Sequence, residues 1–541
     1  MLVATAVDDA DLEASLAEWR KYRRSKRTAD IHWIDLMYQA YLTAIICIVI
    51  IAVATSAVGD AKLTHHQIQQ VLAHGPAWLG GLAAFGLALG LRSGSRGGPL
   101  ALERADVRHI LLAPVDRSTA VRGPAIRQLR FLLFVGMVAG GVAGQIASKR
   151  FGGSGQGWIL TGGVGGVTLA ALSVGAAFAA SGLRLPRWFA TLLGAGLITA
   201  AIADGAGSIP WSPTETYGHL LLWPLHFDPQ GFIPIVLAVA LVATGLALVG
   251  HMSLEMAERR SRLVGQLRFA ATLQDIRTVM VLRRQLALEL PRLQPWVRLK
   301  VRGTGRLPIF VRDLRGFLRW PAARVARMGL IAVVVGFCLR AAWAGTVPVL
   351  LVAGGALFVA GLDAVEPLAQ EVDHPTRRDS SPLEASEIHV RHLPVAVMIE
   401  LLVTALAIAI AVAPGRGQVP GSVAGVAVVT MALGGIGGAI VSVLAGTGSV
   451  DSAWSFAPPE AQGMRVMAKA AWPPTVAILG ALPVLTAIRA VDHGKTAASG
   501  TVPGTVAVLV LFGLIAAWVR MRDDIAVWWR AQMEVASSAQ K

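Results

Sequence analysis

The sequence predicts an all-α integral membrane protein with about twelve transmembrane helices in two tandem six-helix bundles and both termini in the cytoplasm. Three observations predict it. Hydrophobic residues make up 54% of the 541 residues and charged residues only 15%, against about 25% charged in soluble domains. Many apolar runs are long enough to cross a bilayer. The basic residues, which outnumber the acidic ones by 16, lie almost entirely in alternate connections.

Each predicted span is a run of about 20 mostly apolar residues, in which glycine and proline are tolerated. An acidic start, with Asp8, Asp9 and Asp11, argues against a cleaved signal peptide, so the first run is expected to stay in the protein. The least distinct boundary separates the seventh and eighth spans at Trp343–Val347. The spans are 36–59, 76–92, 131–148, 157–182, 188–208, 231–252, 328–345, 346–364, 394–413, 422–446, 471–490 and 503–519.

The basic residues fix the predicted orientation. With the N-terminus inside, 42 Lys and Arg lie on the cytoplasmic side, five lie in outer loops, and Arg340 and Arg489 lie at outer helix ends. Such a bias is typical of cytoplasmic loops. The positive charge therefore records topology, and nucleic acid is not expected as a partner.

The chain divides into five predicted segments. A cytoplasmic amphipathic segment (1–35) precedes the first six-helix unit (36–252), and a basic linker (253–327) leads to the second unit (328–519) and a cytoplasmic tail (520–541). The fourth spans of both units carry similar glycine pairs, Gly162/Gly166 and Gly434/Gly438, which favours a repeat.

The end of the linker, Ile309–Arg327, is predicted to be an interfacial helix. Phe310, Leu314, Phe317 and Leu318 share one face, and arginines share the other. The residues expected to contact lipid headgroups are Arg312, Arg315, Arg319 and Trp320.

Enzyme chemistry is not expected on this chain. Gly494-Lys495-Thr496 resembles the end of a phosphate-binding loop but lacks its first glycine. Two cysteines and scattered histidines predict no metal site, and no catalytic cluster is evident.

Of the intramembrane acids only Glu400, about two turns inside the ninth span, lies deep enough for proton coupling. A carboxylate facing a cytoplasmic vestibule explains it equally well.

Two cytoplasmic loops recur at the same place in both halves, after the second span. The first contains Arg104 and Asp106, followed by Pro114, Asp116 and Arg117 in the stretch Leu111-Leu-Ala-Pro-Val-Asp-Arg117. The second contains Glu366, Glu371, Asp373, Pro375 and Arg377. Each loop combines a short helix-like stretch, a proline and an Asp near an Arg.

These motifs resemble permease subunits of ATP-binding-cassette (ABC) transporters of the type-2 exporter class. The stretch Leu111–Arg117 is similar to a Leu-Pro-Val-Asp/Ser-Arg pattern of such permeases, although here two six-helix units are joined in one chain. The resemblance implies a cell-membrane exporter of a drug, lipid, peptide or envelope component. It also implies a separate cytoplasmic ATPase, as a dimer, that carries ATP and Mg²⁺ and docks on the ten loop residues named above.

Three alternatives stay open at this stage. A secondary, ion-coupled exporter shares the six-plus-six topology, but its usual Asp-Arg-x-Gly-Arg signature is not matched by Asp116–Gly123. A lipid-modifying membrane enzyme lacks an evident polar cluster. A non-transporting scaffold would use the basic linker to bind anionic lipid or a partner.

Overall fold

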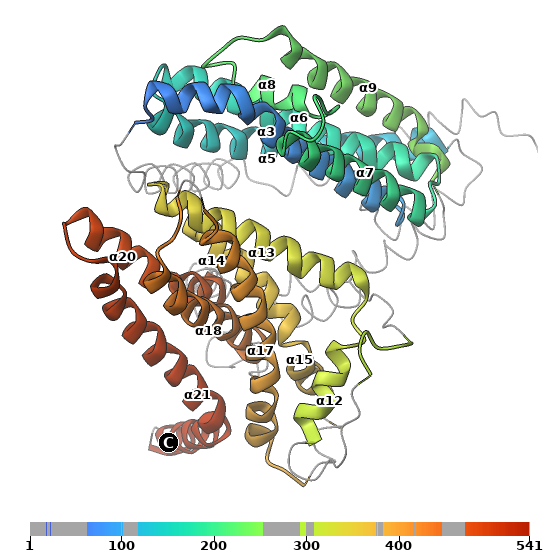
Figure 1. The fold of residues 1–541 in the computed structure, drawn as a ribbon. Coiled ribbons are helices and arrows are strands. Elements are labelled where there is room, and N and C mark those ends of the chain that lie inside the picture. The colour runs from blue at the N-terminus through green and yellow to red at the C-terminus, as the bar shows by residue number, and fades with distance from the viewer. Residues whose placement is uncertain are drawn as a thin grey trace, which may run out of the picture. The chain divides into compact units, whose positions relative to one another are not determined.

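The structure is a computed structural model of the whole chain, drawn in Figure 1. It describes residues 18, 22, 62–98, 100, 117–252, 293–298, 308–374, 376, 382–414, 417–445 and 471–539. These residues form helices and connections without a β-strand. The chain divides into two compact units, Met1–Arg268 and Phe269–Lys541, and the boundary falls within the predicted linker 253–327.

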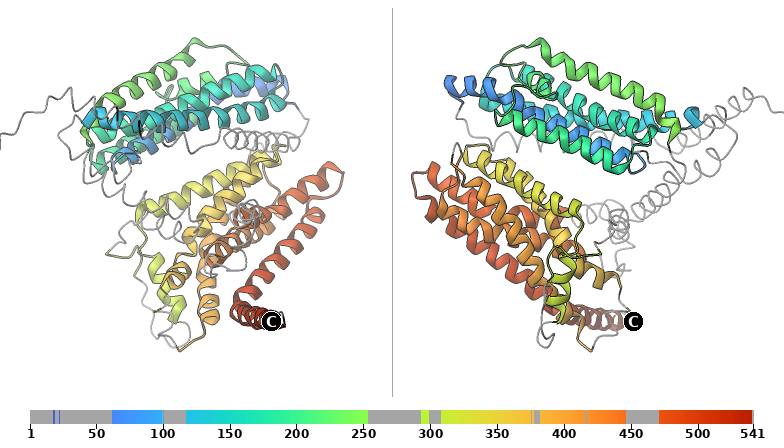
Figure 2. Two further views of the ribbon diagram at one scale, coloured as in Figure 1. Left: turned by 180° about the vertical axis from the view of Figure 1, so that it is seen from behind. Right: turned by 45° about the vertical axis from the view of Figure 1, so that its right-hand side comes forward.

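The first unit is a helical bundle built around α6. Its described elements are α3 (His65–Gly94), α5 (Arg117–Phe151), α6 (Gly155–Gly182), α7 (Arg187–Gly205), α8 (Glu215–Leu221), η1 (Pro229–Gly231), α9 (Phe232–Leu248) and η2 (Val249–His251). Helix α6 packs against α3, α5 and α9, and α7 packs on α3. The long helices of this unit run side by side in every view (Figures 1 and 2).

The second unit is built around α18. Its described helices are α12 (Pro308–Phe317), α13 (Ala322–Trp343), α14 (Val349–Ala364), α15 (Glu366–Asp373), α17 (Ala385–Ala411), α18 (Gly421–Ala445), Ala471–Leu479, α20 (Leu482–Asp492) and α21 (Ala497–Ala539). Helix α18 packs against α14, α17, α20 and α21. In both units the fourth predicted span therefore contacts the second, third and sixth.

Nine of the described helices are long and apolar enough to cross a membrane, and up to eleven are if each of two bent pairs counts as one span. The bends are 58° between α14 and α15 and 50° between Ala471–Leu479 and α20. Each predicted span from 76–92 onward coincides with one of these helices or pairs. The chain is thus an all-helical, multi-pass membrane protein, while the span 36–59 lies outside the described residues and the total of twelve stays a prediction.

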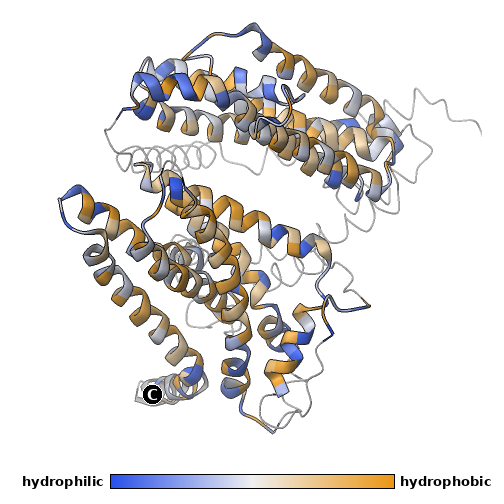
Figure 3. Ribbon diagram, in the orientation of Figure 1, coloured by the Kyte–Doolittle hydropathy of each residue, from blue (hydrophilic) through white to orange (hydrophobic). Residues whose placement is uncertain are grey.

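The bundles place small residues inside and large apolar residues outside. Ala, Gly and Val line much of the buried core, whereas Leu160, Val236 and Leu514 are each more than 60% exposed. Apolar residues dominate the middle of the helices in Figure 3. An apolar surface of this extent is unfavourable in water and suits lipid as the solvent.

Glycines allow α5 and α6 to touch through their backbones. A Cβ atom built on Gly136 or Gly140 would lie 2.5 or 2.1 Å from a carbonyl oxygen of α6, and one on Gly144 would lie 2.0 Å from the oxygen of Trp158. In the second unit, Gly434 and Gly438 press instead on the helix Ala471–Leu479 and its end at Gly480. The glycine pairs of the fourth spans are therefore alike in position but contact different neighbours.

The connection after α7 folds back into the first unit. The stretch Pro210–Gln230 has the aromatic composition of an interfacial belt. Tyr217 on α8, however, is only 2% exposed, and its hydroxyl donates a hydrogen bond to the Gly165 oxygen at 3.0 Å. Gly218 lies against Pro76 of α3 so closely that a Cβ atom would meet the Pro76 oxygen at 2.1 Å. Tyr217 is consequently part of the protein interior and not of a belt.

Candidate functional site

The candidate site lies in the second unit, where α12, α15 and α17 meet. Sequence analysis predicts one helix over 309–327, but α12 ends at Phe317 and α13 begins at Ala322. Pro321 caps α13 in an extended conformation, because proline has no N–H for an interior helical bond. The resulting turn allows α12 to lie across α17, with which it packs.

An amphipathic pattern orients α12. Phe317 is buried and stacks edge to face on Trp320 at a centroid distance of 4.7 Å. Asp313, one turn before Phe317 on the same face, is only 3% exposed. Arg312, Arg315 and Arg319 are exposed on the other face. The buried acid on the apolar face needs a partner from elsewhere in the fold.

That partner is His392 of α17. Its Nδ1 lies 2.5 Å from Asp313 Oδ2, and both side chains are 1% exposed. Its Nε2 lies 3.3 Å from Arg312 Nη2. Arginine can only donate and a carboxylate can only accept, so this geometry assigns the neutral tautomer with the proton on Nδ1.

Arg312 also joins α12 to α15. Its Nη2 lies 2.8 Å from Glu371 Oε1, and Glu371 is 4% exposed. The sequence assigns Arg312 to lipid headgroups and Glu371 to an ATPase contact, whereas the structure pairs these two side chains with each other. Arg315 and Arg319 stay exposed, and Trp320 is half-buried beneath the guanidinium of Arg324.

Two further ion pairs connect the start of α13 to the bend between α14 and α15. Arg324 pairs with Glu366, and Arg327 donates from Nε and Nη2 to Asp363 Oδ2 at 2.9 and 2.6 Å. Together these side chains form what we call the charge network. Its members are Arg312, Asp313, Arg324, Arg327, Asp363, Glu366, Glu371 and His392.

The predicted coupling residues are only partly within the described residues. Glu366 begins α15, Glu371 lies inside it and Asp373 ends it. Arg117 begins α5, but its side chain lies outside the described residues. Six other predicted coupling residues lie entirely outside the described residues: Arg104, Asp106, Pro114, Asp116, Pro375 and Arg377. The first half's loop therefore stays a prediction.

Glu400 lies further along α17, where α14, α17 and α18 meet. It is fully buried, and neither carboxylate oxygen has a hydrogen-bond partner. A Cβ atom on Gly435 of α18 would lie 2.7 Å from its Oε1, so glycine at that position makes room for the carboxylate. Sequence analysis singles out Glu400 for its depth, and the structure adds its lack of a polar partner.

Sequence reasoning missed the pairing of Asp313 and His392, although a signal for each is present. Asp313 shares the helical face of Phe310, Leu314 and Phe317, and His392 shares a buried face of α17 with Leu393 and Ala396. Polar residues on apolar faces indicate buried partners. Within the described residues, no three His, Cys, Asp or Glu side chains are arranged to hold a metal ion.

Comparison with known proteins adds nothing to this assignment. No family model, curated protein or solved structure matches the chain.

Proposed function

We propose that the chain is the membrane-spanning permease of an ATP-driven exporter in the cell membrane. The energy comes from a separate cytoplasmic ABC ATPase dimer, which binds ATP and Mg²⁺, and the chain itself is not an enzyme. The cargo is a drug, lipid, peptide or envelope component. The observation that carries this proposal is the charge network, because it links a segment predicted to be cytoplasmic to the interior of a helical bundle.

The network provides a mechanical path from α15 to α17. A force on α15 acts on Glu371, which holds Arg312 of α12, and the adjacent Asp313 holds His392 of α17. Separating Asp313 from His392 leaves two buried polar groups without each other, and breaking the Arg312–Glu371 contact removes a cation from a buried carboxylate, so the three helices are expected to move together. His392 lies about two helical turns before Glu400, where α17 enters the core of the unit.

The bend between α14 and α15 supports the same role. Helix α15 turns away from the span α14 by 58°, and Arg324 and Arg327 hold both sides of the bend. A docked ATPase would therefore push on a short, braced helix instead of a soft loop. The corresponding residues of the first half, with the motif Leu111–Arg117, would form the second docking site.

A charge swap tests the coupling. We expect Glu371→Arg to reduce ATP-driven export in inside-out vesicles that contain the chain and its ATPase, and Arg312→Glu combined with Glu371→Arg to restore part of it. The matched control is the half-buried pair Glu387–Arg391 within α17, which joins no two helices and whose reversal should leave export unchanged. Equal losses from both pairs, or export without any ATPase, would refute the proposal.

Glu400 favours a second candidate function, an ion-coupled exporter. An isolated carboxyl group inside a helical bundle is typical of proton carriers in membrane transporters. The conservative variant Glu400→Gln separates the two functions, because it keeps the shape and removes the titratable proton. ATP-driven export survives this change under the first proposal. Export driven by a proton gradient is abolished by it under the second.

A further inference from the structure

A short stretch of the linker, residues 293–298, is bound to the turn between α12 and α13 in the second unit; we call it the Trp296 segment. The backbone N–H of Trp296 donates to the Leu318 oxygen at 2.8 Å, and its indole Nε1 donates to the Trp320 oxygen at 2.8 Å. Both acceptors follow Phe317, where α12 ends. Backbone and side chain of one tryptophan therefore fix this part of the linker to the start of α13.

These hydrogen bonds place the Trp296 segment near the depth of lipid headgroups. The membrane span within α13 begins at Arg324, four residues after Trp320. Two extended residues and two helical residues cover at most about 10 Å. The headgroup layer on each side of a bilayer is about 5–8 Å deep. Trp296, which is bonded to Trp320, therefore lies in this layer or at its border.

The exposed side chains of the Trp296 segment are mostly apolar. Leu293 is 97%, Trp296 48% and Val297 56% exposed. Three large apolar side chains within five consecutive residues form a surface that is unfavourable in water. The indole N–H is bonded within the protein, so the exposed part of the ring is hydrocarbon. Tryptophan in this position is typical of the membrane interface.

The charges around the Trp296 segment suit an anionic surface. Arg298 is exposed, and so is Arg319, which lies between the two acceptor residues of Trp296. Residues 290–307 contain five basic residues and no acidic one. Exposed apolar side chains among basic residues are typical of segments that bind anionic lipid. Charge and hydrophobicity therefore point to the same partner, a membrane surface.

The neighbouring helix α12 offers less apolar surface to lipid than its sequence suggests. Phe310 and Leu314 are half-buried and Phe317 is buried, while α12 packs with α17. Arg312 pairs with Glu371 of α15. Apolar contact with lipid at this turn therefore falls to the Trp296 segment.

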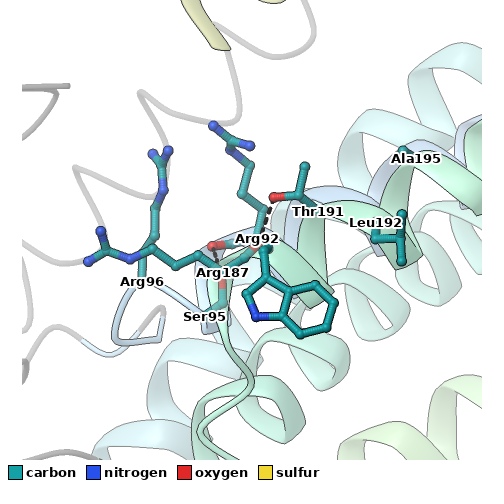
Figure 4. Close-up of a pocket in the computed structure, with 8 residues that line it drawn as sticks. Arg92, Ser95, Arg96, Arg187, Thr191, Leu192 and Ala195 are labelled. Carbon is teal, nitrogen blue, oxygen red and sulfur yellow. Dashed lines mark hydrogen bonds between the residues drawn. The ribbon is translucent and has the colours of Figure 1, made fainter. Parts of the chain in front are cut away.

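The start of α7 in the first unit offers a comparison. Arg187 begins α7, and Trp188, which is 70% exposed, follows it. Both residues line a pocket together with Arg92 and Thr191 (Figure 4). A tryptophan beside an arginine thus begins a span there within one helix, whereas Trp296 reaches the start of α13 from 24 residues before Trp320.

We propose that the Trp296 segment inserts Leu293, Trp296 and Val297 into the cytoplasmic leaflet of the membrane, with Arg298 and Arg319 at anionic headgroups. The predicted orientation places the start of α13 on this side, where the leaflet carries anionic lipid. The membrane then holds this part of the linker at a fixed depth beside α12. This inference is independent of what the chain transports and of how transport is driven.

The test measures the depth of a nitroxide spin label on the full chain in vesicles of equal parts of phosphatidylcholine and phosphatidylglycerol. The label is attached to Val297→Cys after Cys47 and Cys338 are changed to Ala. Leu514→Cys, on a side chain of α21 that is 64% exposed, is the lipid control, and Gln532→Cys, ten residues beyond the span of the same helix, is the water control. We expect the label at Val297 to collide with oxygen more often than with a water-soluble nickel complex, as at Leu514 and unlike at Gln532.

The vesicles contain no other protein, so an ATPase cannot shield the label. A second copy of the chain would broaden the spectrum through the interaction of two labels, even when the chain is diluted in lipid. Such broadening, or a label at Val297 as accessible to the nickel complex as the one at Gln532, would overturn the proposal. Leu293→Cys, on a side chain that is 97% exposed, gives the same test at a position where no packing is disturbed.

Charge removal tests the arginines. Arg298→Gln with Arg319→Gln should lower the ratio of inserted to solvent-exposed label by about fivefold per arginine, the equivalent of about 1 kcal/mol each. Changing the exposed Arg122 and Arg127 of α5 to Gln removes the same charge from the first unit and should leave the ratio unchanged. An equal loss in this control would show attraction by net charge alone and would overturn the proposal, as would an unchanged ratio in the first variant.

Discussion

The contact between α5 and α6 permits a sharp test of the packing of the first unit. A Cβ atom on Gly140 would lie 2.1 Å from the oxygen and 2.9 Å from the carbonyl carbon of Gly162. These are backbone atoms, which cannot rotate away as a side chain can. An ordinary contact of 3.4 Å would require the helices to separate by about 1.3 Å at this point. Gly140→Ala should therefore destabilise the unit.

The adjacent Gly141 is the matched control. A Cβ atom there would meet nothing closer than 3.7 Å, an ordinary van der Waals distance. Alanine stabilises a helix by about 0.8–1.0 kcal/mol relative to glycine at either position, so this term cancels between the two variants. Overpacking costs about 1–3 kcal/mol, which is the expected difference in free energy of unfolding between Gly140→Ala and Gly141→Ala.

The assay is equilibrium unfolding in mixed micelles, in which denaturing detergent is titrated and helix content is followed by circular dichroism. Gly162→Ala should cost a similar amount, because its Cβ atom would meet the Gly140 oxygen at 2.3 Å. Once the helices have separated, the second alanine meets less resistance, so the double variant should cost less than the sum. Equal stability of Gly140→Ala and Gly141→Ala would refute the close contact of α5 and α6.

Three further predictions concern polar groups that are fully or partly buried. Asp313→Ala should lower the free energy of unfolding by about 1–3 kcal/mol by leaving a buried ring N–H unpaired, whereas Arg391→Ala on a half-buried pair within one helix should cost about 0–1 kcal/mol in the same titration. Equal costs would contradict the burial of Asp313 and His392. Tyr217→Phe should cost about 0.5–1.5 kcal/mol in that assay through loss of its buried hydrogen bond, and a null effect would contradict it. Burial and the nearby Asp204 raise the pKa of Glu215, so the folded state binds its proton more tightly and stability falls as pH rises above the ordinary value near 4.5. The measurement is the melting temperature between pH 5 and 7, with His219→Gln in both chains to remove the neighbouring imidazole. The melting temperature should fall more steeply with pH when Glu215 is present than when it is changed to Gln. Parallel curves would contradict the raised pKa of Glu215.

The helices of the fold could be predicted from the sequence because a bilayer demands long apolar runs. Every span predicted within the described residues coincides with a helix or a bent pair. Hydropathy did not show that Tyr217 and its short helix fold inward, because Pro210–Gln230 has the composition of a surface loop. Its burial depends on distant residues, because Tyr217 bonds to Gly165 of α6 and the adjacent Gly218 packs against Pro76 of α3.

The candidate site was predictable only in part, because its contacts join residues far apart in the chain. Glu366 and Glu371 stood out as acids beside a proline after a span. Their partners Arg324 and Arg312 belong to a basic stretch about 40 and 60 residues earlier, where net charge indicated lipid. A surplus of arginines records which side of the membrane a segment occupies, but it does not show which arginine is neutralised by the protein itself.

The two units differ in the charged residues at the ends of their second predicted spans. Their second, fourth and sixth predicted spans pack in the same combinations, so the repeat extends to the backbone. At the end of α14 the second unit places Asp363 against Arg327, and Glu366 follows against Arg324. At the corresponding end of α3 the first unit carries Arg92 and Arg96 instead of acidic residues. The repeated helical packing therefore does not extend to the charges at this end, so the ion pairs of the second unit do not predict those of the first.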